Sequence, residues 1–164
     1  MDLALGTQHL ALFQGNIPVA DLNRDKQARN EVILHSPVIA IVGRSNDHYY
    51  SSYQVGEYLQ QHGFTVYNVN PNVDEIDGAP SYASLQEVPE PIDIVDVFRR
   101  SEYLSEIVDE AIAIGAKTVW GQLGVEDEAA RQKALNAGLN VAMNLCLRTE
   151  HEHLMAHPLH GEVD

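Results

Sequence analysis

The chain has only one cysteine, Cys146, among its 164 residues. A single thiol excludes an internal disulfide framework and is typical of proteins from reducing compartments. The sequence also lacks an apolar run long enough to cross a bilayer, and its first residues lack the basic segment of a secretory leader. We therefore expect a soluble, cytoplasmic protein.

Basic residues are scarce. Lys and Arg total 10 against 24 Asp and Glu, which gives a formal net charge of −14. Because nucleic acids and anionic membranes are bound through clustered positive charge, this balance argues against both as main partners. An anionic small ligand would have to be met locally by backbone N–H groups, a helix N-terminus and a few arginines. A homodimer or a protein partner is left open.

Two common nucleotide-binding motifs are missing. The sequence has no G-x-G-x-x-G for a dinucleotide and no G-x-x-x-x-G-K-[ST] for a P-loop. The second predicted strand runs into Val69-Asn70-Pro71-Asn72, without the acidic residue that would bind the ribose of NAD. NAD binding and P-loop ATP binding are thus both disfavoured.

From Pro37 onward, short apolar runs alternate with amphipathic helical stretches. Runs without polar alternation are typical of strands buried on both faces of a parallel sheet. Strands are predicted over 38–42, 65–69, 92–98, 117–120 and 140–143. The pattern predicts an α/β fold, a Rossmann-like doubly wound parallel sheet with strand order 3-2-1-4-5 in a three-layer α/β/α arrangement.

Three segments are expected along the chain. Residues 1–36 form an N-terminal extension with a helix from about Leu22 to Leu34, residues 37–157 form the Rossmann-like domain, and residues 158–164 form a C-terminal tail. Ser51 with Gln54 resembles a capping box for one helix, and Ser101 is expected to cap another.

Ligands of such sheets bind at the carboxyl ends of the strands. The loop after the first strand begins Gly43-Arg44-Ser45 and leads to a helix start at Ser51-Ser52, where free N–H groups can hold phosphate. Phe98-Arg99-Arg100-Ser101 follows the third strand, and its guanidinium groups can pair with phosphates, stack on a base, or simply pair with surface carboxylates. Gln122 and Gly124 follow the fourth strand, where the chain can approach a ligand or merely turn.

Together these loops resemble the stand-alone CoA-binding domain proteins, which are similar to the CoA-binding N-terminal domain of the succinyl-CoA synthetase α subunit. The resemblance covers about residues 32–154 and is most specific in the stretch 88–101, PEPIDIVDVFRRS with its preceding valine. It implies a fold that holds coenzyme A, or an acyl-CoA, across the carboxyl edge. The sequence shows no catalytic motif of its own, so we expect a binding module that does not catalyse a reaction.

The resemblance also implies a role for each loop. Gly43, Arg44, Ser45 and the helix start at Ser51 and Ser52 would face the CoA diphosphate. The adenosine end would be flanked by Asn70, Pro71, Asn72 and by Phe98, Arg99, Arg100, Ser101. The pantetheine arm would lie near Gln122 and Gly124.

The chain departs from the family pattern at two places. An Asp-Arg pair that usually precedes the late cysteine is replaced by Asn144 and Leu145. Residue 44 is more often small or apolar, so Arg44 is an addition of this chain to the phosphate site.

Other functions stay open beside CoA binding. An enzyme could use Cys146 or His48 on an acyl thioester or a nucleotide, although the leucines beside Cys146 predict a buried, inert thiol. An interaction scaffold without a ligand is a third alternative. His153 and His157 are spaced for one helix face, but zinc sites need four ligands and Pro158 ends the helix, so no metal is predicted.

Overall fold

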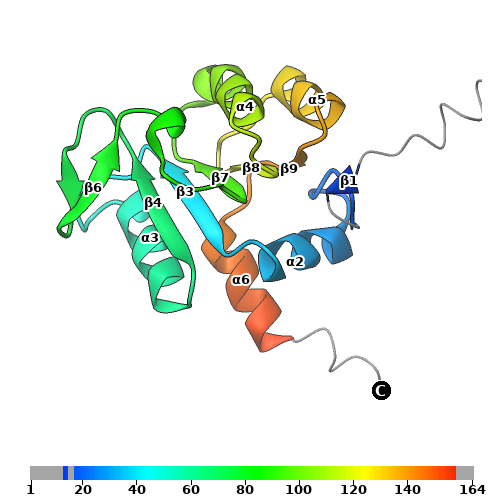
Figure 1. The fold of residues 1–164 in the computed structure, drawn as a ribbon. Helices are drawn as coiled ribbons and strands as arrows, with labels where there is room; N and C mark the ends of the chain where they lie inside the picture. The colour runs from blue at the N-terminus through cyan, green and yellow to red at the C-terminus, as the bar shows by residue number, and fades with distance from the viewer. Residues whose placement is uncertain (1–12, 15–16, 158–164) are drawn as a thin grey trace, which may run out of the picture.

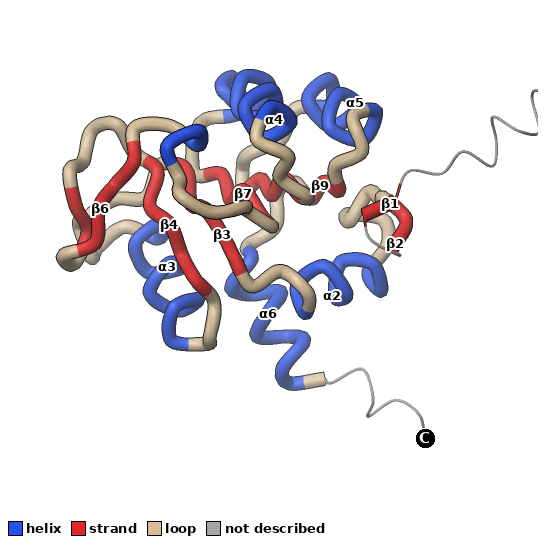
Figure 2. Tube along the Cα trace, viewed as in Figure 1, coloured by secondary structure: helices blue, strands red, loops and turns tan. Residues whose placement is uncertain are grey.

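A parallel sheet forms the centre of the molecule. The computed structural model describes residues 13–14 and 17–157. Seven strands lie in the order β5-β6-β4-β3-β7-β8-β9, and all neighbours are parallel except the antiparallel pair β5 and β6 (Figures 1 and 2). The strands are β3 (Val38–Val42), β4 (Thr65–Val69), β5 (Glu75–Ile76), β6 (Ala79–Tyr82), β7 (Ile94–Val97), β8 (Thr118–Gly121) and β9 (Asn140–Ala142).

The strand order 3-2-1-4-5 is present, but the third strand along the chain is not the one that was predicted. That position belongs to β6, a short strand that the sequence did not reveal, and a sixth parallel strand, β9, follows at the other side. The strand predicted over 92–98 is therefore the fourth, and it lies centrally beside β3. Because the chain changes direction across the sheet between β3 and β7, this pair marks the switch point where ligands of such folds bind.

Helices cover both faces of the sheet (Figure 1). On one face lie α4 (Leu104–Ala113) and α5 (Glu128–Asn136), together with the 3₁₀ turn η1 (Leu85–Glu87). On the other face lie α2 (Lys26–Leu34), α3 (Ser51–Gln61) and α6 (Leu147–Ala156). A second 3₁₀ turn, η2 (Ser101–Tyr103), leads into α4, and a small antiparallel hairpin pairs β1 (Phe13–Gln14) with β2 (Ile17–Pro18). The α/β/α layering is confirmed.

Two cores explain the continuous apolar strands. In β3, Ile39 and Ile41 belong to the core beneath α2, α3 and α6, whereas Ala40 and Val42 belong to the core beneath α4 and α5. Every second side chain of a strand faces the same side, so burial on both sides requires an uninterrupted apolar run. None of the helices in the described part of the chain is long and apolar enough to cross a membrane.

The helix starts differ from those expected. Asp25 caps α2, its side chain accepting a hydrogen bond from the Ala28 N–H at 2.9 Å, so the helix begins at Lys26 and not at Leu22. Neither α3 nor η2 has a side-chain cap. The Gln54 amide instead donates to the His48 and Tyr49 carbonyls at 3.0 and 3.1 Å, which ties the preceding loop to the first turn of α3.

The N-terminal segment before α2 covers the free edge of β9. Leu22 donates to the Val141 carbonyl at 2.7 Å, and Val141 donates to Ala20 at 3.3 Å. The Asn23 amide bonds both backbone groups of Met143, at 2.7 and 2.8 Å. The described part of the predicted extension is thus bonded to the sheet. The predicted tail, residues 158–164, lies outside the described residues.

A carboxyl group is buried in the middle of the central strand β7. Asp96 is fully buried, and neither of its oxygens has a hydrogen-bond partner among the described residues. Its register neighbours are the apolar Ile41 and Trp120. Burial raises the pKa of Asp96 well above its ordinary value, so the neutral acid is the form that this environment favours.

This burial predicts a pH dependence of stability. A raised carboxyl pKa in the folded state means that stability is fully present below the ordinary value of 3.8, falls above it, and is lost once the pH passes the folded-state pKa. Each unit of difference costs about 1.4 kcal/mol. Asp96→Asn removes the ionisation. The unfolding free energy of the variant should therefore increase relative to that of the wild type as the pH rises from 4 to 8.

Urea unfolding across that pH range measures the effect. Asp74→Asn, which changes an exposed residue outside the core, serves as the control and should show no comparable gain. A constant difference for Asp96→Asn would show that Asp96 does not titrate as its burial implies.

Candidate functional site

Two adjoining hollows lie over the carboxyl ends of the central strands. The first, of about 350 Å³, is lined by Gly43, Ser45, Tyr50, Ser51, Ser52 and Phe98. The second, of about 400 Å³, shares Ser51 and Phe98 with the first and adds Val55, Arg99, Arg100, Gln122, Leu123, Gly124, Val125 and Cys146. We call the two together the carboxyl-edge groove. Among the described residues, none of those that line it is acidic, although the chain as a whole has a net charge of −14.

Gly43 brings the ends of three strands together. Its φ is +90°, and its N–H donates to the Val69 carbonyl of β4 at 2.7 Å. A Cβ at this position would lie 2.7 Å from the Phe98 carbonyl oxygen and 3.1 Å from Cδ of Arg99. Only glycine satisfies both the left-handed backbone and this close approach. The turn after β3 therefore packs directly against the end of β7.

The loop after Gly43 is held in a compact shape over the start of α3. The Ser45 N–H donates to Oγ of Ser52 at 2.9 Å, and Oγ of Ser45 accepts from the Asp47 N–H at 2.9 Å. The first turn of α3 forms the opposite wall through Ser51 and Ser52. An uncapped helix start beside a glycine turn offers N–H groups and the positive end of the helix dipole to an anion.

The two arginines after β7 are held differently. The stem of Arg99 lies against Gly43, and its guanidinium stacks over the ring of Tyr103 at 4.4 Å. Arg100 forms an ion pair with Glu102 at 3.2 Å and donates to the Tyr103 hydroxyl at 3.2 Å, which raises the pKa of Arg100. Arg99 thus lies nearer the Gly43 turn, with its charge free of any carboxylate pair within the described residues.

The loop after β8 forms the far wall of the groove. Oε1 of Gln122 accepts from the Leu147 N–H at 3.1 Å, so the predicted ligand residue also caps α6. Gly124 adopts φ +81°, and its N–H donates to Oδ1 of Asn144 at 2.8 Å. Asn144 itself has φ +58°, a conformation that asparagine tolerates better than most residues. Asn144, which departs from the family pattern, therefore supports this wall.

Ser101 does not line the groove, and its predicted cap of α4 is wrong. Its hydroxyl donates to the Gly124 carbonyl at 3.1 Å and accepts from the Glu126 N–H at 3.0 Å. The serine thus bridges the loops after β7 and β8 and fixes their spacing.

The predicted adenosine-side residues after β4 lie outside the groove lining. Nδ2 of Asn70 donates to the Arg44 carbonyl at 2.9 Å, and its Oδ1 accepts from the Asn72 N–H at 3.0 Å. Pro71 and Asn72 are exposed. Asn70 therefore supports the Gly43 loop from outside.

Arg44 is buried, which corrects the expectation that its side chain extends the phosphate site. It is 1% exposed, and its guanidinium donates to Oδ1 of Asn68 at 2.8 Å and to the Tyr53 carbonyl at 3.1 Å. A direct contact between this side chain and a ligand in the groove would require it to leave this pocket.

Cys146 is half-buried, packs partly against the core beneath α2, α3 and α6 and also lines the groove, so the predicted burial is only partial. It stands immediately before α6, whose Glu150 N–H bonds its carbonyl at 3.0 Å. Leu147 is fully buried in that core, and Leu145 is partly buried against it, as is the cysteine.

His48 belongs to a separate cluster on the neighbouring loop. Its ring stacks on Tyr53 at 4.0 Å, and Nε2 lies 3.5 Å from Oδ1 of Asp77. The Tyr53 hydroxyl donates to Asp77 at 2.5 Å, which raises the pKa of Tyr53 to about 12. Across the described residues, no serine of the Gly43 loop is hydrogen-bonded to His48. The arrangement fastens the loop to the turn between β5 and β6.

Four lining residues were not among the predicted site residues: Tyr50, Val55, Leu123 and Val125. Tyr50 is 56% and Leu123 68% exposed. Large apolar side chains in loops that follow parallel strands were the available sequence signal for both.

A larger hollow of about 970 Å³ lies between α2 and α6. Its lining includes the ion pair between Arg29 and Glu150 at 3.0 Å, as well as His153 and His157. The described residues contain no group of three or more His, Cys, Asp or Glu side chains placed to hold a metal ion. This hollow lacks the strand-end loops and glycine turns that an anionic cofactor needs.

Comparison with known proteins identifies the family. Residues 37–152 match the family described as the CoA binding domain. The chain belongs to this family. Within the CoA-binding domain family, it is 37% identical over 129 residues to the uncharacterized protein YneT of Bacillus subtilis, which covers 79% of this chain and 96% of YneT. A solved structure of a hypothetical protein from Pyrococcus horikoshii has a TM-score of 0.76 with 37% identity, covering 80% of this chain and 92% of that one.

A larger enzyme subunit contains a similar region. The α subunit of the ADP-forming acetate–CoA ligase II of Pyrococcus furiosus is 25% identical over 114 residues. The match covers 65% of this chain but only 25% of that subunit. The expected resemblance to stand-alone CoA-binding domain proteins, and to a CoA-binding domain like that of succinyl-CoA synthetase, is confirmed. Three quarters of the ligase subunit have no counterpart in the match.

The close approach at Gly43 predicts a local stability cost. Gly43→Ala must adopt a left-handed φ and displace the Phe98 carbonyl, so we expect a loss of about 2–4 kcal/mol in unfolding free energy. Gly63→Ala is a matched control because Gly63 has φ +92° but no atom within 4 Å of its Cβ position. It should lose only about 1–2 kcal/mol. Urea unfolding measures both, and equal losses would contradict the packing described for Gly43.

Proposed function

We propose that this protein is a non-catalytic module that binds coenzyme A or an acyl-CoA in the carboxyl-edge groove. The observation that carries the proposal is a groove without acidic lining, beside two arginines and a helix start, in a member of the CoA-binding domain family. Hollows of this size lie within the usual range for small-molecule sites. The single cysteine favours a reducing, cytoplasmic compartment.

We assign two parts of CoA to the two hollows. The diphosphate is assigned to the first hollow, where the start of α3, which has no side-chain cap, presents N–H groups. Arg99 and Arg100 supply cations beside it. The pantetheine arm fits the second hollow, whose wall from Gln122 to Val125 combines amide groups with apolar side chains. The thiol end would then approach Cys146.

A second candidate is an enzyme that acts on an acyl thioester through Cys146. One observation favours it, since this thiol lines the groove at the N-terminus of α6. His48 is a weaker candidate because it is engaged with Asp77 and Tyr53 and does not line either hollow.

Calorimetric titration with CoA, dephospho-CoA and NAD tests the binding function. We expect CoA to bind more tightly than NAD. Arg99→Ala should weaken CoA binding about 10- to 100-fold, as expected for lost hydrogen bonds to a charged group. Arg100→Ala should cost less, because Glu102 already pairs with Arg100. Arg24→Ala, at an 89% exposed side chain away from the groove, is the control.

The absence of heat and of a thermal shift with millimolar CoA would contradict the proposal and favour an interaction scaffold. Equal losses in all three arginine variants would show that only net charge matters.

Incubation with acetyl-CoA separates the module from the enzyme. A binding module should leave the thioester intact, and Cys146→Ala and His48→Ala should bind CoA about as well as the wild type. Free CoA released by the wild type, and not by Cys146→Ala, would establish the enzyme instead. Thiol titration against a protein blank measures the release.

A further inference from the structure

Arg44 carries a buried charge without a carboxylate partner at hydrogen-bonding distance. Both of its acceptors, Oδ1 of Asn68 and the Tyr53 carbonyl, are neutral, and its Nε has no partner among the described residues. Arginine stays protonated in proteins, although burial lowers the pKa of Arg44 from its ordinary value. Burying an unpaired charge costs free energy, so a fold selected for stability alone would favour an apolar residue here.

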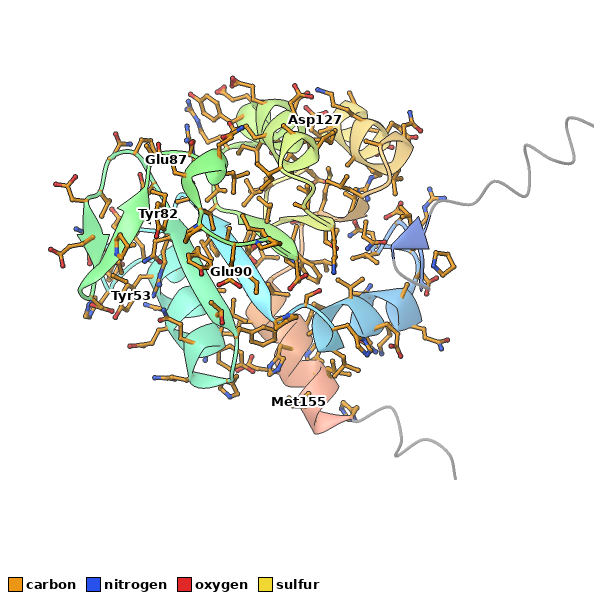
Figure 3. The ribbon with its side chains drawn as sticks, in the orientation of Figure 1. Tyr53, Tyr82, Glu87, Glu90, Asp127 and Met155 are labelled. Atoms are coloured by element: carbon orange, nitrogen blue, oxygen red, sulfur yellow. The ribbon has the colours of Figure 1, made fainter. Side chains whose placement is uncertain are left out.

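The surrounding elements leave space for this guanidinium. A Cβ on Gly56 of α3 would lie 2.4 Å from Nε of Arg44, so the helix can pass over the charge only because residue 56 is glycine. Asn68 of β4 is itself 1% exposed and is held by a 3.4 Å hydrogen bond to the Pro80 carbonyl. The Tyr53 ring covers the guanidinium at 4.9 Å (Figure 3 labels Tyr53 on α3).

The loop that carries Arg44 forms part of the wall of the first hollow. Gly43 and Ser45, its two neighbours in the chain, line that hollow, and so does Ser52, which precedes the Tyr53 carbonyl that Arg44 bonds. Its hydrogen bond to the Tyr53 carbonyl places the guanidinium beside the first turn of α3, the end at which the helix dipole is positive. Since no water separates a buried group from its surroundings, its field on an anion in the hollow is weakly screened.

Two carboxylates face Arg44 from outside, and both are engaged elsewhere. Asp77 accepts from the Tyr53 hydroxyl at 2.5 Å and pairs with His48, while Glu57 lies 3.5 Å from the same hydroxyl. Both attract the guanidinium through space, but neither forms an ion pair with it. The charge of the guanidinium is therefore offset only through space.

We propose that Arg44 is a positioning residue that strengthens binding of the CoA diphosphate from beneath the groove, without touching it. The inference rests on the proposed function. In this view the charge of Arg44 attracts the phosphates of the ligand, in addition to the attraction from Arg99 and Arg100 at the edge of the groove. Compared with a chain that has an apolar residue at position 44, the protein without ligand is less stable, and its affinity for phosphorylated ligands is higher.

Asn68→Asp tests this proposal because it should raise the stability of the free protein and lower its affinity for the ligand. The new carboxylate would lie 2.8 Å from the guanidinium and neutralise it at nearly the same side-chain volume, with the loss of the long hydrogen bond that Asn68 donates to Pro80. We expect a higher Tm without ligand but about tenfold weaker binding of both CoA and inorganic pyrophosphate. Arg44→Met should weaken both ligands similarly, and Arg44→Lys should restore part of the affinity. Arg24→Met, which changes the net charge equally at an exposed site, should leave both affinities unchanged.

The outcomes separate cleanly. If Asn68→Asp raises the Tm and binds CoA within twofold of the wild type, the inference is wrong. It is also wrong if Arg44→Met weakens pantetheine, which lacks the diphosphate, as much as it weakens CoA, because the role of Arg44 is then purely structural. A wild type that binds neither CoA nor pyrophosphate refutes the proposed function itself, a result distinct from both.

Discussion

The packing of the Gly43 turn against the end of β7 is the contact on which the groove depends. The turn accepts no side chain, since a Cβ would meet the Phe98 carbonyl at 2.7 Å. This approach places the loop after β3 and the arginine pair after β7 side by side, although more than 50 residues separate them in the sequence. Every ligand group proposed here is positioned relative to this contact.

Around this contact, neutral side chains fix the shape of the groove, and charged side chains are available to attract an anionic ligand. Ser101, Asn144 and Asn70 all bond backbone groups of the loops and so set the spacing of the walls. Arg99 is left free of such tasks. A site built this way is formed before the ligand arrives, which reduces the entropy lost on binding.

The strands and most helices could be predicted because burial on two faces leaves a clear pattern of apolar runs. The hairpin of β5 and β6 could not, because two- and four-residue strands containing Pro80 carry too little pattern. The directions in which side chains point could not be predicted from the sequence either. Arg44 and Arg99 each follow a central strand, yet one is buried under α3 and the other lines the groove, because Gly56 makes room for only the first. Likewise Cys146 is only partly buried and also lines the groove, although its leucine neighbours suggested burial.

The segment at residues 20–23 changes what the outer side of strand β9 offers to other chains. An outer strand with free N–H and C=O groups is a template on which another chain can add a strand. Here Ala20, Leu22 and Asn23 fill those bonds on β9 from within the same chain. A form shortened to the family-matched residues would present an unsatisfied ladder to solvent. The leading segment thus satisfies backbone groups that the outer side of the sheet would otherwise expose.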